Sequence, residues 1–187
     1  MNEALLYLSR HNAWASKVLL ATCRTITPVQ LTAPAPAAYG SIIETFNHLV
    51  TSEGAHLSSL GGPVTTWVAA ARHEREQHPE PWTIDDAREQ VATLDELSLR
   101  VDELDRLWES FFTAAEFDPE RTAILDLGTY ACPAGIVMAQ SFHHGSVHRE
   151  QICATLTALG VDPPDVQPWA FADATGRSRL LGGRTSY

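Results

Sequence analysis

Apolar residues recur every three or four positions along most of this 187-residue chain, which is the spacing of one face of an α-helix. The spacing predicts four long helices, over residues 2–24, 41–60, 83–115 and 133–159. No segment shows the clear alternation of apolar and polar residues that is typical of a half-buried strand. The pattern therefore predicts an all-α protein whose helices pack as an up-down four-helix bundle.

Capping signals support the ends of these helices. Ser41 and Glu44 form the capping-box pattern that opens the second helix. Thr83 with Asp86 is a similar signal for the third helix. Gly160 follows the fourth helix, where a glycine commonly ends helical structure.

The segments between the helices are rich in proline and glycine. Residues 27–40 form a Pro-rich loop, residues 63–82 are interpreted as an extra loop after the second helix, and residues 161–187 as an irregular tail. A chain of this length can bury one full core, so we expect a single domain over residues 1–187.

The charge of the chain limits its partners. A formal net charge of -10 gives no basic field for a phosphate backbone, and only a short group of arginines, Arg177, Arg179 and Arg184, lies near the end. No apolar run approaches the length that spans a membrane. Three widely spaced cysteines suit a reducing compartment. We therefore expect a cytoplasmic protein that binds neither nucleic acid nor membrane.

Two histidines of the fourth helix are the most informative residues. His144 and His148 are four positions apart, so both imidazoles point to the same side of the helix. His48 borders an apolar stripe of the second helix and is a candidate for a third ligand. Three imidazoles on facing helices would suit a divalent metal with open coordination positions.

Two familiar metal motifs do not fit. Gly145 follows His144 where the H-E-x-x-H zinc motif needs its glutamate. A di-iron bundle needs two Glu-x-x-His motifs, and Glu53 with His56 is the only match. Hydrogen-bonded core histidines remain the alternative to a metal site at this point.

Several segments together resemble the DinB family. They are Asn47-His48-Leu-Val, Phe142-His-His-Gly-Ser-Val-His-Arg-Glu-Gln151, and Ala158-Leu-Gly160 followed by Pro163-Pro164, with His11-Asn-Ala-Trp14 near the start. The resemblance covers most of residues 1–165. It implies a four-helix bundle, often a homodimer, that holds a divalent metal, zinc or nickel, on His48, His144 and His148.

The same resemblance suggests an activity. The wider superfamily includes transferases and isomerases that use low-molecular-weight thiols, so the leading hypothesis is a metal-dependent thiol S-transferase acting on a small electrophile. A non-catalytic, metal-binding dimer with a stress-related or ligand-sensing role is the main alternative. A metal-dependent hydrolase is a third possibility, although no carboxylate is clearly placed as its general base.

Residues beside the histidines have less specific signals. Gln151 is a candidate for orienting a ligand, and Arg149 for pairing with a carboxylate or an anionic substrate. Gly145 inside a helix suggests close backbone packing. His56 is a candidate residue at the rim of the site, and His11 is a weaker one.

Overall fold

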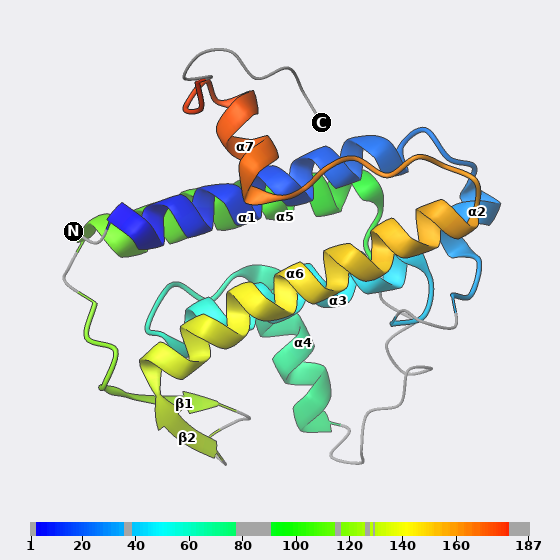
Figure 1. Ribbon diagram of the computed structural model, residues 1–187. Helices are drawn as coiled ribbons and strands as arrows, with labels where there is room; N and C mark the ends of the chain where they lie inside the picture. The colour runs from blue at the N-terminus through cyan, green and yellow to red at the C-terminus, as the bar shows by residue number, and fades with distance from the viewer. Residues whose placement is uncertain are drawn as a thin grey trace.

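The computed structural model describes residues 3–35, 39–77, 91–114, 117–125, 128 and 130–179. This part of the chain is mostly helical, and one small hairpin precedes the longest helix (Figure 1). The elements in chain order are α1 Glu3–Cys23, α2 Pro28–Thr32, α3 Ile42–Ser59, α4 Thr66–Gln77, α5 Leu94–Ala114, β1 Thr122–Leu125, β2 Tyr130–Pro133, α6 Ala134–Ala158 and α7 Pro168–Ala174. None of these helices is long and apolar enough to cross a membrane.

The four long helices pack in two pairs. Helix α1 lies along α5, and α3 lies along α6, while contacts of α1 with α6 and of α3 with α5 join the pairs (Figure 1). A row of ion pairs from α1 and the residue that follows it to α5 shows that these two helices are antiparallel: Arg10 with Glu109, Lys17 with Asp105, and Arg24 with Asp95.

The direction of α5 differs from the expected up-down alternation. Arg100 donates to Asn47 at 3.4 Å, and farther along both helices Trp108 Nε1 donates to Glu53 Oε1 at 2.9 Å. Contacts that advance together along both helices mean that α3 and α5 are parallel. The connection over residues 60–93 includes α4, and it is long enough to return the chain to the end of the molecule where α3 begins.

One apolar core lies between the two pairs of helices. Its largest fully buried side chains include Phe46 from α3, Trp108 from α5, Leu19 from α1 and Ile152 from α6. Each comes from the apolar stripe of its helix, so the period in the sequence identifies the core-facing side.

Three expected helices are confirmed with boundaries close to those of α1, α3 and α6. Ser41 caps α3 as a capping box, since its backbone N–H donates to Glu44 Oε2 at 2.6 Å and the Glu44 N–H donates to Ser41 Oγ at 3.4 Å. Gly160 follows α6 with a φ of +74°, a left-handed conformation that glycine adopts without strain.

The expected start of the third helix is wrong within the described residues. Helix α5 begins at Leu94, although the apolar stripe extends back to Val91. Thr93 and Glu96 form a capping box, in which the Thr93 N–H donates to Glu96 Oε2 at 2.7 Å. Thr93 is therefore the N-cap, and the helix begins at the next residue. The cap expected at Thr83 and Asp86 lies outside the described residues.

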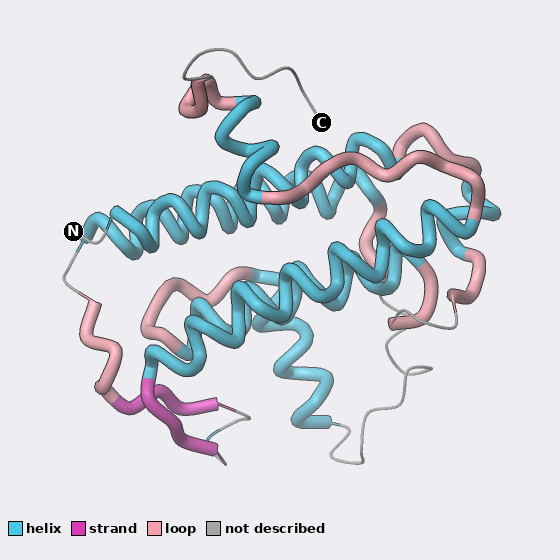
Figure 2. The backbone as a smooth tube through the Cα atoms, viewed as in Figure 1, coloured by secondary structure: helices cyan, strands magenta, loops and turns pink. Residues whose placement is uncertain are grey.

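The loops also contain more regular structure than expected (Figure 2). Residues 63–82 contain the helix α4, the Pro-rich loop contains α2, and the tail contains α7. The antiparallel pairing of β1 with β2 corrects the expectation that the chain has no strands. Neither strand alternates in sequence, because β1 contains Ala123-Ile-Leu125 and β2 contains Tyr130-Ala-Cys132, each a run of three apolar residues.

Candidate metal centre

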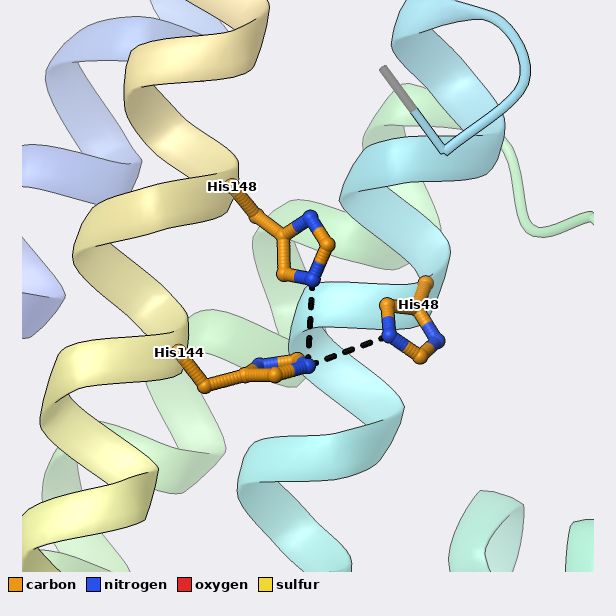
Figure 3. Close-up of side chains that lie close together, drawn as sticks. All are labelled: His48, His144 and His148. Carbon is orange, nitrogen blue, oxygen red and sulfur yellow. Dashed lines mark hydrogen bonds between the residues drawn. The ribbon is translucent and has the colours of Figure 1, made fainter. Parts of the chain in front are cut away.

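Three imidazoles meet between α3 and α6. His48 extends from α3 toward His144 and His148 of α6 (Figure 3). His144 Nε2 lies 3.1 Å from His48 Nε2 and 3.1 Å from His148 Nε2. The ligand atoms of the three residues all lie within 4.8 Å of one another. Nitrogens bound to one zinc ion at about 2.0–2.1 Å are roughly 3.3 Å apart in a tetrahedral site, so the two 3.1 Å spacings at His144 suit a metal.

Hydrogen bonding at these rings favours a cation between them. Gln151 Oε1 accepts from His148 Nδ1 at 2.7 Å, which leaves the lone pair of neutral His148 on Nε2. His144 Nε2 carries at most one hydrogen, yet it faces two other ring nitrogens. A divalent cation would satisfy all three nitrogens at once, whereas a single N–H would not. The residues present therefore fit a metal.

Two aromatic residues of the chain lie against the histidine rings. Tyr39 stacks on His48 with ring centroids 3.9 Å apart and an angle of 14° between the planes. The ring of His56 lies edge-on to His144 at 5.8 Å. His56 was expected near the rim from its spacing to His48. Tyr39 was missed, because it lies in the Pro-rich loop, where no periodic signal assigns a side chain to a face.

Burial keeps the three imidazoles neutral. Burial first, and then the charges of His148 and His56, lower the pKa of His48 to about 4. The pKa of His144 is lowered to about 3, first by burial and then by its histidine neighbours. Burial also lowers the pKa of His148, against the hydrogen bond to Gln151, which raises it. A metal can therefore bind these imidazole nitrogens without first displacing protons from imidazolium ions.

The metal-free protein should lose stability as the pH falls from about 6.5, where unfolded histidines titrate, toward the value of about 4 for folded His48. In this window the unfolded state binds more protons than the folded state, so the free energy of unfolding decreases with decreasing pH. Urea unfolding at a series of pH values measures this slope. His144→Ala should reduce it, and His73→Ala, at an exposed position of α4, should leave it unchanged. Equal slopes in all three proteins would contradict the assignment of this pH dependence to the buried histidines.

Arg149 points away from the three imidazoles and into the core. Only 2% of it is exposed, and its guanidinium donates to Asn12 Oδ1 at 2.7 Å and to Ser16 Oγ at 3.3 Å, both on α1. Gly145 explains how α1 comes so close, since a Cβ at this position would lie 2.8 Å from Asn12 Oδ1. The close packing expected at Gly145 is therefore present, against α1 rather than at the metal centre.

The remaining candidates lie elsewhere. His11 Nε2 is 2.8 Å from the carbonyl oxygen of Val166, and its ring packs near Phe171 of α7. Cys153 is buried in the core, and burial raises the pKa of its thiol to about 11, so it is not poised as a thiolate.

A comparison with protein-family models agrees with the histidine motif. The model of the DinB family matches residues 1–179 of the chain. The chain belongs to the DinB family. No protein with a curated description matches the sequence significantly. DinB proteins bind metals, and this DinB protein holds three histidines that could bind one.

Proposed function

We propose that this protein is a metal-dependent thiol S-transferase, a single-domain enzyme built on the DinB four-helix bundle. Its metal would be zinc or nickel, since imidazole nitrogens suit both ions. Its substrates would be a low-molecular-weight thiol and a small electrophile. The observation that carries the proposal is the convergence of His48, His144 and His148 on one point between α3 and α6.

The donor set supports a catalytic site rather than a purely structural one. Three neutral ligands leave the full charge of a divalent ion and keep coordination positions open, whereas structural zinc is usually enclosed by four protein ligands. When bound, such an ion supplies Lewis acidity that stabilises an anionic sulfur or oxygen.

The chain's own residues would prepare this site. Gln151 holds the Nδ1–H of His148, and this fixes the tautomer that presents Nε2 to the centre. Partial burial keeps His48 and His144 unprotonated at neutral pH. Both effects organise the ligands before a substrate arrives.

The first test is elemental analysis of protein purified without chelators and without a nickel column. The second is a panel of thiols, including bacillithiol, mycothiol and glutathione, each offered with a chromogenic aryl halide. The metal-loaded protein should accelerate conjugation with at least one thiol, and metal removal should abolish the acceleration. A protein that binds one metal per chain and conjugates none of these thiols would overturn the transferase proposal in favour of a non-catalytic bundle. Metal-dependent ester hydrolysis without conjugation would favour the hydrolase.

We also propose that two copies associate through the outer face of α6. Only one exposed position of this helix carries a formal charge, Glu150. The exposed positions of α6 are Ile136, Ala139, Gln140, His143, Ser146, Val147, Glu150, Ala154, Thr157 and Ala158. A long helix face with a single charged residue is unusual for a surface in water, and a second copy would cover it.

The dimer should dissociate when a charge is placed on this face. Ile136 is 61% exposed, so Ile136→Glu should fold normally and should elute as a monomer with the mass measured by light scattering. Leu99→Glu is the matched control, because Leu99 is 68% exposed on α5 and lies off this face. A wild-type protein that is already monomeric at micromolar concentration would refute the dimer.

A further inference from the structure

We propose that Tyr39 is a positioning residue of the metal centre, whose ring fixes the orientation of the His48 imidazole. The inference rests on the metal site of the proposed function. The Tyr39 ring stacks on His48 at 3.9 Å and 14°, and it lies edge-on to His148 at 6.2 Å and 83°. One aromatic ring thus contacts two of the three candidate ligands.

The chain holds Tyr39 in this place through the first turn of α3. Thr45 Oγ1 lies 2.8 Å from the Ser41 carbonyl oxygen and 3.2 Å from the Tyr39 carbonyl oxygen, so its one hydroxyl hydrogen is shared between the two carbonyls that flank Gly40. Gly40 has a φ of +80°, a left-handed conformation that turns the chain sharply between Tyr39 and the helix. A Cβ at Gly40 would lie 2.5 Å from Glu44 Oε2, the atom that completes the capping box with Ser41. The turn, the cap and the Thr45 hydroxyl therefore set the position of Tyr39 relative to His48.

The ring of His48 needs such a support more than the ring of His148 does. The ring of His148 is oriented by Gln151 through Nδ1. Within the described part of the chain, no hydrogen bond reaches Nδ1 of His48. Rotation of the His48 ring about its Cβ–Cγ bond would turn Nε2 away from His144. The stacked Tyr39 ring opposes this rotation, because a tilted imidazole would collide with it.

The stacking predicts that the ring of Tyr39 matters and that its hydroxyl does not. Zinc affinity is measured by competition with a chromophoric chelator, and the geometry of the site by the visible absorption of the cobalt-loaded protein. Tyr39→Leu should weaken zinc binding about tenfold, in the range found when an outer support of a metal ligand is removed. It should also change the cobalt bands, while Tyr39→Phe should match the wild type in both measurements. Tyr130→Leu, at an exposed tyrosine of β2, is the matched control.

The possible outcomes separate this inference from the proposed function. Unchanged zinc affinity and cobalt bands in Tyr39→Leu would overturn the positioning role, whatever the activity. Equal losses in Tyr39→Phe and Tyr39→Leu would assign the effect to the hydroxyl and would also overturn it. If Tyr39→Leu fails to fold by circular dichroism, Tyr39→Met provides a second side chain without a ring for the same measurements. A wild-type protein that binds zinc but transfers no thiol would refute the proposed function and would leave the role of Tyr39 intact.

Discussion

Replacing His144 with alanine should abolish tight binding of a divalent cation and any activity that depends on it. His144 is the central member of the three, since its Nε2 lies 3.1 Å from both of the other ring nitrogens. Its loss leaves two ligands on different helices, so the affinity should fall by more than about 100-fold, beyond the effect of removing an outer support. Isothermal titration with zinc measures the change.

The adjacent residue offers a matched control for this prediction. His143 is exposed on the same helix and does not belong to the three histidines, so His143→Ala should keep the wild-type affinity. Zinc should raise the melting temperature of the wild type and of His143→Ala, but not that of His144→Ala, because a ligand stabilises only the protein that binds it. Wild-type zinc affinity in His144→Ala would exclude the three-histidine site.

The cluster of three histidines could be predicted from the sequence because it depends on the periodicity of individual helices. His144 and His148 share a face of α6 through their spacing, and the apolar stripe beside His48 indicated which side of α3 faces inward. The family resemblance, carried by the motif around the same residues, is confirmed by the match over residues 1–179. Long periodic helices and residues on their inward faces are thus predictable from one sequence.

Tyr39 and the direction of α5 depend on tertiary structure instead. Tyr39 lies outside any helix, and a sharp turn at Gly40 brings its ring to His48. The parallel arrangement of α3 and α5 is set by contacts between the two helices that are distant in the sequence, such as that of Trp108 with Glu53. The expected third helix began too early in the sequence, because the apolar stripe includes Val91. The true start is set by the capping box at Thr93, which the stripe does not reveal. Local periodicity contains no information on any of these three features.

The second large effect should come from Arg149, through the stability of the fold. Arg149 and Glu53 are both buried, and their charges interact across the core. Burial raises the pKa of Glu53, while its hydrogen bond with Asn12 and the charge of Arg149 lower it. Arg149→Met would remove the cation that interacts with the Glu53 charge and would leave Asn12 Oδ1 and Ser16 Oγ without this donor, and each buried polar group left unsatisfied costs about 1–3 kcal/mol. Urea unfolding of the metal-free protein measures the loss.

The pH dependence and a second substitution identify the cause of this loss. Without Arg149 the pKa of Glu53 should rise further, so the folded variant retains a proton that the unfolded chain releases, and the loss of stability should increase with increasing pH. Glu53→Gln should recover part of the stability in the Arg149→Met background, since the buried charge is gone. Arg106→Met, at an exposed arginine of α5, should have little effect. If Arg149→Met instead keeps its stability and loses zinc affinity, Arg149 acts at the metal centre, and the pairing with Glu53 does not explain its burial.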